Sequence, residues 1–318
     1  MKKILITGFS GFVSRHFLNY LYENKLAYEV MGADIKEPAF DLKEYQEICP
    51  VAFQKLNLLD EEGVASIIEQ FRPDYILHLA AFSSVAYSWE HPADCFSNNT
   101  RIFLNLTNAV RNMDKNCRIL SVGSSEEYGN VRESDLPLRE NMQLVPVSPY
   151  AVARVAQEMM SKVYVDNFDM DIVMTRSFNH MGPFQDERFV IPSFVKRILE
   201  VRKSGHTQGS IETGDTTIIR DFVDVRDVVR AYYMLLMEGT PGEVYNISSN
   251  RKVALSKVIE EIANIVGVSI EGKVNSDFVR PDDNRVVVGS YDKINNDIGW
   301  QPQISLRKTL EDMVAQME

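Results

Sequence analysis

Residues 3–34 read KILITGFSGFVSRHFLNYLYENKLAYEVMGAD and contain two apolar runs separated by a helical pattern. The apolar run at 3–7 predicts a strand, residues 12–23 repeat apolar positions with helical spacing, and residues 28–34 predict a second strand. Two strands joined by one helix of this size require a parallel, right-handed crossover. The opening residues therefore predict an α/β fold built on a parallel sheet.

The alternation of strand and helix continues through the first half of the chain. Further apolar runs predict strands at residues 53–56, 75–79, 118–122 and 171–175. Helical patterns lie between them at residues 63–71, 95–113 and 150–164. The predicted strands are continuously apolar, which is what a sheet covered by helices on both faces demands. We therefore expect a doubly wound parallel sheet.

The regular alternation of predicted strands and helices ends at about residue 176. Polar, glycine-containing connections are predicted around residues 204–217 and 274–285. Helices are predicted at residues 191–202, 225–237, 255–266 and 306–317, and a strand that returns to the main sheet is predicted at 244–247. We expect a first domain at residues 1–176, with a return near 215–248, and a smaller C-terminal lobe at 177–318.

Composition excludes several classes of protein. The 318 residues carry 45 acidic and 34 basic side chains, a net charge of -11, which disfavours nucleic acid as a partner. No apolar run approaches the ~20 residues of a membrane span, and the N-terminus lacks a secretory signal, so we expect a cytoplasmic protein. Cys49, Cys95 and Cys117 are never spaced as C-x-x-C, and the five histidines are scattered, so we expect no metal site.

The glycine turn between the first strand and helix predicts a dinucleotide site. Gly8 and Gly11 allow a tight bend through which a pyrophosphate can approach the N–H groups at the helix N-terminus. Asp34 ends the next strand, where a carboxylate can bind the ribose 2′-hydroxyl. The alternatives are a simple strand–helix turn and a solvated acid. Asp34 favours NAD as the cofactor, with NADP as the second possibility.

A second group of candidates follows the strand at 118–122. Residues 124–129 read SSEEYG, and a helix capped by Ser148 and started by Pro149 carries Tyr150 and Arg154. Their i, i+4 spacing places both on one helix face, where the cation favours the ionised phenol. Such a tyrosine suits acid or base chemistry on a sugar hydroxyl or carbonyl. A purely structural helix pair is the alternative.

These patterns together resemble the extended short-chain dehydrogenase/reductases that act on nucleotide sugars, over nearly the whole chain. The matching motifs are TGFSGFV (7–13), HLAA (78–81), SSEEYG (124–129), SPY (148–150), RSFNH (176–180), RDFVDVRD (220–227) and Arg280-Pro281. The combination of GSSEEYG (123–129) with FNHMGP (178–183) is most similar to the GDP-4-keto-6-deoxy-mannose reductases and their relatives, the GDP-mannose 4,6-dehydratases. The resemblance implies a Rossmann-type domain that binds the dinucleotide and a lobe that binds the nucleotide sugar.

The resemblance also implies roles for individual residues. Ser124 would hydrogen-bond the reacting oxygen, Tyr150 would be the acid or base, and Arg154 stands where the family has lysine. Residues implied in cofactor binding are Gly8, Gly11, Phe12, Asp34, Asn57, Leu79, Ala80, Ala81, Asn99, Tyr150 and Arg154. Residues implied in substrate binding are Ser125, Asn179, Arg220 and Arg280. Departures from the family are Asn57 in place of aspartate and Ile102-Phe103 in place of Gly-Thr.

The sequence leaves the reaction open among related activities. The first expectation is NAD(P)H-dependent reduction at C4 of a nucleotide-linked 4-keto-6-deoxy sugar, with GDP as the expected nucleotide, by a homodimer. Glu126 completes a triplet, Ser124-Ser125-Glu126, that in 4,6-dehydratases supplies the base for the C5 proton. A dehydratase, or a C4 oxidoreductase or epimerase with retained NAD, is therefore the alternative. Arg154 and Ile102-Phe103 also leave a non-catalytic dinucleotide or nucleotide-sugar sensor open.

Overall fold

Seven parallel strands form the main sheet of the computed structural model, which describes residues 1–278 and 284–318. Their order across the sheet is β11-β6-β5-β4-β1-β2-β3. The strands are β1 (Lys2–Thr7), β2 (Tyr28–Asp34), β3 (Val51–Lys55), β4 (Tyr75–His78), β5 (Arg118–Ser124), β6 (Ile172–Ser177) and β11 (Val244–Ile247). The chain order reverses between β1 and β4, so the carboxyl ends of these strands flank the position where open α/β sheets bind ligands.

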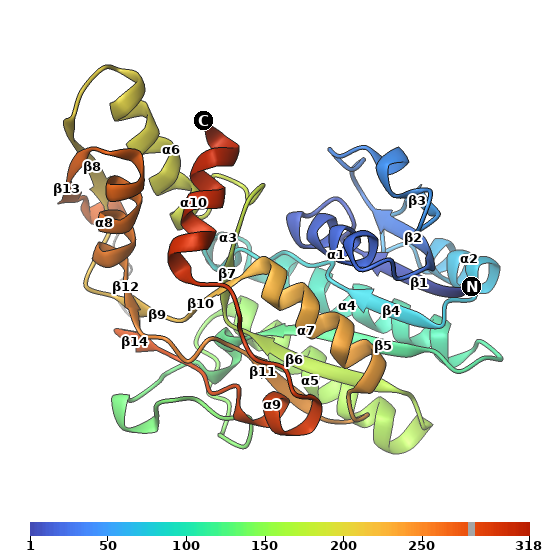
Figure 1. Cartoon of the computed structure of the whole chain (residues 1–318). Helices are drawn as coiled ribbons and strands as arrows, with labels where there is room; N and C mark the ends of the chain where they lie inside the picture. The colour runs from blue at the N-terminus through green and yellow to red at the C-terminus, as the bar shows by residue number, and fades with distance from the viewer. Residues whose placement is uncertain (279–283) are drawn as a thin grey trace.

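Helices cover both faces of this sheet (Figure 1). On one face α1 (Phe12–Glu23) packs against α7 (Val225–Glu238), and on the other α4 (Pro92–Arg111) packs between α2 (Glu61–Phe71) and α5 (Pro149–Phe168). Alternate residues of β1 enter the two cores. Ile4 and Ile6 join the core under α1 and α7, whereas Leu5 joins the core under α2 and α4. The expected doubly wound parallel sheet is confirmed.

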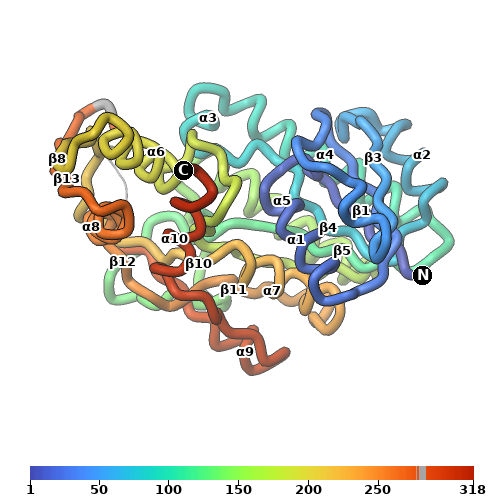
Figure 2. Tube along the Cα trace, turned by 45° about the horizontal axis from the view of Figure 1, so that its top comes forward, coloured from blue at the N-terminus to red at the C-terminus, as the bar shows by residue number. Residues whose placement is uncertain are grey.

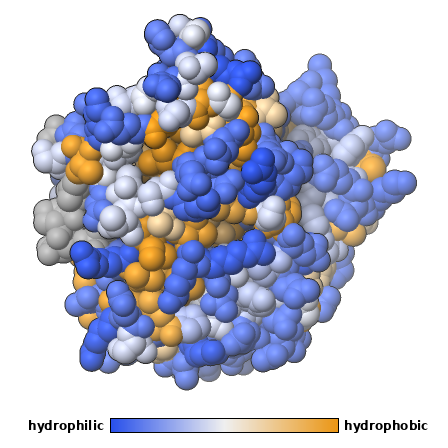
Figure 3. Space-filling view, turned by 60° about the vertical axis from the view of Figure 1, so that its left-hand side comes forward, coloured by the Kyte–Doolittle hydropathy of each residue, from blue (hydrophilic) through white to orange (hydrophobic). Residues whose placement is uncertain are grey.

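A smaller lobe lies beside the carboxyl ends of the strands (Figures 1 and 2). It contains α6 (Val190–Lys203), α8 (Leu255–Val266), α10 (Leu306–Met317) and a parallel pair of strands, β8 (Gln208–Thr213) and β13 (Ser269–Val274). Its three helices share a separate apolar core that includes Phe194, Ile262 and Leu310. The surface in Figure 3 is mostly hydrophilic, with hydrophobic residues showing between the charged ones.

Short elements connect the sheet domain and the lobe. Two parallel strands, β7 (Asn179–Met181) and β10 (Phe222–Asp224), pair with each other, and a small sheet has the order β12-β9-β14. Its strands are β12 (Val253–Ala254), β9 (Ile219–Arg220) and β14 (Val286–Val287). The remaining elements are α3 (Val85–Glu90), α9 (Asp292–Ile298) and the 3₁₀ helices η1 (Leu42–Tyr45), η2 (Ser125–Tyr128), η3 (Glu133–Asp135) and η4 (Ser276–Phe278).

The structure corrects one part of the sequence interpretation. Residues 204–217 were expected to form a connection, but they contain β8, which pairs along its whole length with β13. Five of the six residues of β13 and three of the six residues of β8 are exposed, so neither strand has the continuous apolar run by which the central strands were recognised. Residues 225–247 belong to the sheet domain, where they form α7 and β11, while the division of the chain at residue 176 stays a prediction.

In the part of the chain that the structure describes, no helix is long and apolar enough to cross a membrane.

Candidate active site

The glycine turn lies at the carboxyl end of β1, against the loop that follows β4. Gly8 has a φ of +70°, and a Cβ at this position would lie 2.8 Å from the backbone N of Ala80. A side chain is therefore excluded both by backbone conformation and by space. The Ser14 hydroxyl donates to the Gly8 carbonyl at 3.0 Å, so this serine fits where close packing of helix and strand is needed.

The N-terminus of α1 is suited to a pyrophosphate. Gly11 is its N-cap, and within the described residues no side chain caps this end and no acid lies in its first turn. Asp60, Ser148 and Asp224 accept backbone N–H groups at the starts of α2, α5 and α7, whereas α4, α6 and α8 also begin without a side-chain cap. The glycine turn is what distinguishes the start of α1. The first N–H groups of a helix lack partners within the helix itself. Gly8 and Gly11 therefore leave a cradle of donors that fits the dinucleotide implied by the sequence.

Asp34 lies at the end of β2 and faces the glycine turn. Its Oδ2 accepts a hydrogen bond from the Ser10 backbone N–H at 2.9 Å, and its Oδ1 accepts one from Lys36 N–H at 3.2 Å. The Ser10 hydroxyl donates in turn to the Lys36 carbonyl. Each carboxylate oxygen keeps a further lone pair, so the group can still accept hydrogen bonds from ribose hydroxyls.

The other residues expected to bind the cofactor lie along neighbouring strand ends. Leu79, Ala80 and Ala81 follow β4, and Asn99 clamps the continuation of this loop through two hydrogen bonds, from Phe82 N–H to Oδ1 at 2.8 Å and from Nδ2 to the Phe82 carbonyl at 3.1 Å. Asn99 is buried, so the structure places it beneath the loop. Two residues lie apart from this loop. Asn57 is exposed and its Oδ1 accepts the Leu59 N–H, and the Phe12 ring stacks on His180 with 5.7 Å between centroids.

Tyr150 and Arg154 meet on the first turns of α5. The Ser148 hydroxyl caps this helix by accepting the Ala151 N–H at 3.1 Å, which fixes where the helix begins. Arg154 Nε donates to the Tyr150 hydroxyl at 3.2 Å, and both side chains are buried. The i, i+4 spacing therefore brings the cation onto the phenol, as the sequence predicted.

The guanidinium of Arg154 also bonds to β5 and to its own helix. Its Nη1 donates to the Val122 carbonyl at 3.1 Å and to Gln157 Oε1 at 2.8 Å. Gln157 Nε2 in turn donates a hydrogen bond to the Ser121 hydroxyl at 2.8 Å. Burial, and then the charge of Arg154, lower the pKa of His78 to about 3, so this histidine is neutral at physiological pH. Gln157 and His78 were not identified as site residues from the sequence.

The expected substrate-binding residues are spread over several elements. Ser124 ends β5, Ser125 is buried in η2, and Asn179 is exposed on β7. Arg220 lies on β9, where its Nη1 donates to the carbonyls of Ile219 and Asn284 at 3.0 and 2.8 Å. Arg280 lies outside the described residues.

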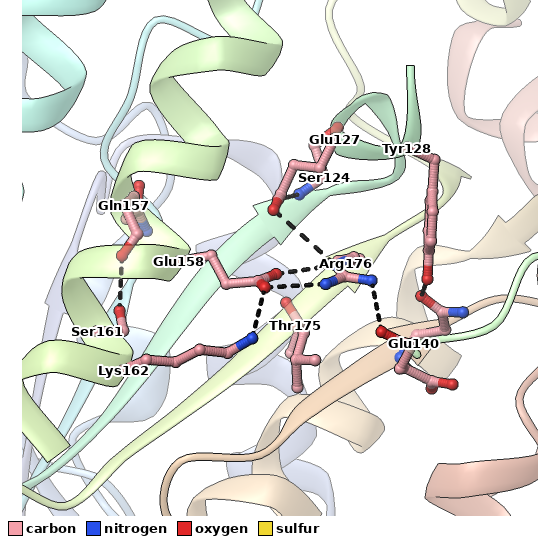
Figure 4. A network of polar contacts seen from close by, with 12 residues as sticks. Ser124, Glu127, Tyr128, Glu140, Gln157, Glu158, Ser161, Lys162, Thr175 and Arg176 are labelled. Atoms are coloured by element: carbon pink, nitrogen blue, oxygen red, sulfur yellow. Dashed lines mark hydrogen bonds and ion pairs between the residues drawn. The ribbon is translucent and has the colours of Figure 1, made fainter. Parts of the chain in front are cut away.

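A buried ionic network lies directly behind Ser124 (Figure 4). Arg176 of β6 binds both oxygens of Glu158 of α5, with Nε and Nη2 each 2.8 Å from a carboxylate oxygen. Glu127 approaches the same guanidinium nitrogen as Glu158, with its Oε2 4.0 Å from Nε. The exposed Glu126 is the acid that the sequence singled out, whereas its neighbour Glu127 is fully buried. The signal that the sequence does carry is the spacing from Ser124 to Glu127, which matches a capping box and distinguishes Glu127 from Glu126.

Among the described residues, no group of three or more His, Cys, Asp or Glu side chains could hold a metal ion. The functional groups that the described residues bring to the carboxyl ends of the parallel strands are a phenol, a guanidinium, hydroxyl groups and carboxyl groups. A phenol that touches a cation can pass a proton to or from an oxygen atom. The adjacent glycine turn can place a dinucleotide against the same sheet edge.

Similarity to known proteins covers the full length of the chain. The GDP-mannose 4,6-dehydratase family model matches residues 5–313. The GDP-6-deoxy-D-mannose reductase of Pseudomonas aeruginosa is 29% identical over 317 residues, covering 100% of this chain and 97% of the relative. The GDP-mannose 4,6-dehydratase of Yersinia enterocolitica is 27% identical and covers 99% of this chain and 93% of its own length.

Solved structures of related enzymes are similar to this chain over nearly its whole length. RMD from Pseudomonas aeruginosa complexed with NADPH has a TM-score of 0.84 at 29% identity and covers 100% of this chain and 97% of its own. UDP-glucose 4-epimerase from Thermotoga maritima with UDP-glucose has a TM-score of 0.86 at 28% identity, covering 99% and 98%. The chain therefore belongs to the GDP-mannose 4,6-dehydratase family of extended short-chain dehydrogenase/reductases.

Proposed function

We propose that this protein reduces a nucleotide-linked 4-keto-6-deoxyhexose at C4, with NAD(P)H as the cofactor and GDP as the nucleotide. The observation that carries the proposal is the contact between Tyr150 and Arg154 at the end of β5, in a chain that aligns end to end with a GDP-6-deoxy-D-mannose reductase. Relatives that bind NADPH or NAD support the choice of cofactor. The shared family alone would also allow dehydration or epimerisation.

Each residue of the candidate site has a separate role in the proposed reaction. The reduced dinucleotide supplies the hydride when it is bound. Tyr150 donates its phenolic proton to the oxygen at C4, and Arg154 Nε holds the phenol oxygen through the hydrogen bond of 3.2 Å. Ser124, at the end of β5, donates a hydrogen bond to the same oxygen and keeps the carbonyl in place. Asn179, Arg220 and Arg280 are proposed to bind the sugar and the nucleotide diphosphate, for which the planar fork of arginine is suited.

Incubation with GDP-4-keto-6-deoxy-mannose and either reduced cofactor tests this proposal. We expect oxidation of the cofactor in step with the appearance of a GDP-6-deoxyhexose. Turnover with any nucleotide sugar would also remove the alternative of a non-catalytic sensor. Absence of turnover with this substrate, combined with conversion of another nucleotide sugar, would contradict the choice of substrate.

A dehydratase is the second candidate, and Glu126 favours it. This glutamate is exposed next to Ser124, so its carboxylate can reach a bound sugar, as the C5 base of a dehydratase must. Incubation with GDP-mannose and NAD distinguishes the two activities. Formation of a 4-keto-6-deoxy product would contradict the reductase proposal, whereas recovery of unchanged GDP-mannose agrees with it.

We also propose that the protein is a cytoplasmic homodimer that associates through α4 and α5. Residues Val152, Met159 and Val163 are spaced 7 and 4 residues apart and form an exposed apolar stripe on α5. Phe96 on α4 and Trp89 on α3 are exposed as well, and both helices pack against α5. Large exposed apolar side chains on adjacent helices favour association with another protein surface, and an identical copy offers the same stripe.

A further inference from the structure

Glu127 is a buried acid to which the proposed reaction assigns no task. Its side chain is fully buried, although the preceding residue, Glu126, is exposed. Its Oε1 accepts a hydrogen bond from the backbone N–H of Ser124 at 2.7 Å, which completes a capping box at the start of η2. The carboxyl group therefore holds the backbone of the residue that we propose contacts the reacting oxygen.

The backbone next to Ser124 leaves space for this carboxyl group. A Cβ on Gly123 would lie 2.3 Å from Oε1 of Glu127 and 2.5 Å from the Thr175 carbonyl oxygen. Any side chain at position 123 would therefore displace the carboxyl group or the neighbouring strand. The position of the Glu127 carboxyl group at the end of β5 therefore depends on a glycine at position 123.

The surroundings of Glu127 favour its neutral form. In the described part of the chain its Oε2 has no hydrogen-bond partner, and Arg176 Nε lies 4.0 Å away. Arg176 already binds both oxygens of Glu158, so an ionised Glu127 would add a second buried carboxylate to one guanidinium. An incompletely compensated buried charge is strongly unfavourable. A proton on Oε2 removes this charge and leaves Oε1 free to accept the Ser124 N–H.

The titration behaviour agrees with this geometry. Burial raises the pKa of Glu127 to about 8, and the charge of Glu158 acts in the same direction, while the Ser124 N–H and Arg176 oppose them. Burial disfavours the charged form of Glu158 too, but Arg176 outweighs it and holds the pKa of Glu158 below its usual value. The charged groups that act on Glu127 are Arg176 from β6 and Glu158 from α5. Lys162 of α5 pairs with Glu158, and Tyr128 of η2 and Glu140, from the segment before α5, lie close to Arg176.

We propose that Glu127 is a positioning residue for Ser124, acting as a neutral carboxylic acid whose Oε1 holds the serine amide. The proposal rests on the proposed reductase function, because the position of Ser124 matters to turnover only if Ser124 contacts the reacting sugar. When Glu127 loses its proton, negative charge develops next to Glu158 and behind Ser124. Repulsion between the two carboxylates then shifts the end of β5, so turnover should fall on the alkaline side.

Glu127→Gln and Glu127→Val separate charge from hydrogen bonding in kinetic measurements. Glutamine keeps a carbonyl acceptor for Ser124 and places N–H groups where the proton of Glu127 lies, so its kcat should persist at alkaline pH where wild-type kcat declines. We expect it to exceed wild type by about fivefold at about pH 9. Valine removes the acceptor and should lower kcat about tenfold at every pH, with the KM for the dinucleotide unchanged. Superimposable alkaline limbs for wild type and Glu127→Gln would overturn the proposal.

Thermal unfolding tests the neutral acid without any assumption about catalysis. A folded pKa raised above its unfolded value means that the native state binds more protons between the two values, so this group lowers stability as pH rises. The Tm of Glu127→Gln minus that of wild type should therefore grow by several degrees between about pH 5 and 8 and become constant above about pH 9. Glu133→Gln, which makes the same change at an exposed site, should give a difference that does not vary with pH.

The two experiments fail in distinguishable ways. A pH-independent difference for Glu127→Gln would mean that Glu127 is ionised throughout, which overturns the proposal whatever the activity. Lack of turnover with every nucleotide sugar would instead contradict the proposed function and with it the assignment of Ser124. The thermal result would in that case still decide whether Glu127 is a neutral acid.

Discussion

At the scale of single residues, two neighbouring glutamates show what the sequence can and cannot reveal. Glu126 and Glu127 have the same chemistry and share one motif, yet one is exposed and the other is buried against Arg176. The direction of each side chain depends on the 3₁₀ turn after β5 and on a strand more than 40 residues away in the sequence. Gly8 is different, because its need for a positive φ is local and leaves a direct mark on the sequence.

Tyr150→Phe should abolish most of the turnover without disturbing the fold. Phenylalanine keeps the ring but removes the proton that Tyr150 is proposed to donate, and the Nε of Arg154 loses its acceptor. We expect kcat to fall at least about 100-fold, with little change in the affinity for the dinucleotide. Steady-state kinetics and cofactor titration measure the two effects separately. A variant that keeps near wild-type turnover would show that the proton comes from another group.

Asp34→Asn should weaken the preference for NAD(H) over NADP(H). The carboxylate faces the glycine turn, so a 2′-phosphate placed there would meet a negative charge and lose the ribose hydrogen bond. Asparagine keeps an acceptor for Ser10 while removing the charge, and we expect the ratio of the two dissociation constants to change about tenfold. Asp41→Asn is the matched control, because Asp41 caps η1 on the exposed surface. An unchanged ratio would leave Asp34 with a structural role in the turn alone.

At the scale of elements, the strands with continuous apolar runs were predicted well and the two-stranded sheet of the lobe was not. The predicted helices at 12–23, 255–266 and 306–317 have the same bounds in the structure, because each combines helical periodicity with a clear start or stop. In contrast, β8 has only two buried residues out of six, and its partner β13 lies about 60 residues further along the chain. Pairing of this kind depends on the lobe as a whole, so local periodicity does not reveal it.

The arginine on α5 should be replaceable by lysine only at a cost in stability. Nε of Arg154 donates to Tyr150, while Nη1 donates to Val122 and Gln157. Two different nitrogens of the guanidinium therefore make these hydrogen bonds. A single ammonium group cannot occupy both places, and Gln157 Oε1 would remain buried without a donor. For Arg154→Lys we expect a loss of about 1–3 kcal/mol in the free energy of unfolding, with kcat kept within about tenfold because the charge remains.

A double-mutant cycle checks this explanation. Gln157→Met in the Arg154→Lys background removes the orphaned acceptor and should recover part of the lost stability, so the two changes should be coupled by about 1 kcal/mol or more. Arg154→Met is the companion variant, and it should weaken cofactor binding and lower kcat further than lysine does, because it removes the charge. Additive effects of Arg154→Lys and Gln157→Met on stability would exclude the proposed network.

At the scale of the whole molecule, the motif at 220–227 connects the sheet domain to the segments that form the lobe. Asp221 accepts the backbone N–H groups of Ser249 and Gly289, and Asp224 accepts the Thr309 hydroxyl of α10. Asp227 accepts the backbone N–H groups of residues 303 and 304, just before α10. The motif was identified in the sequence by its resemblance to the family. The residues that its aspartates bind lie up to about 85 positions away in the sequence, so only the structure identifies them.

The exposed stripe on α5 leads to a prediction about the assembled protein. If a second copy covers Val152, Met159 and Val163, a charge at the centre of the stripe must be desolvated in the dimer but remains hydrated in the monomer. Met159→Lys should therefore shift the mass measured by light scattering from that of two chains to that of one, with little change in the Tm of the isolated chain. Val274→Lys introduces the same charge at a valine of β13 that is 67% exposed and lies in the other lobe, so it should leave the dimer intact. A wild-type protein that is monomeric at micromolar concentration, or a dimer that persists in Met159→Lys, would place the partner surface elsewhere.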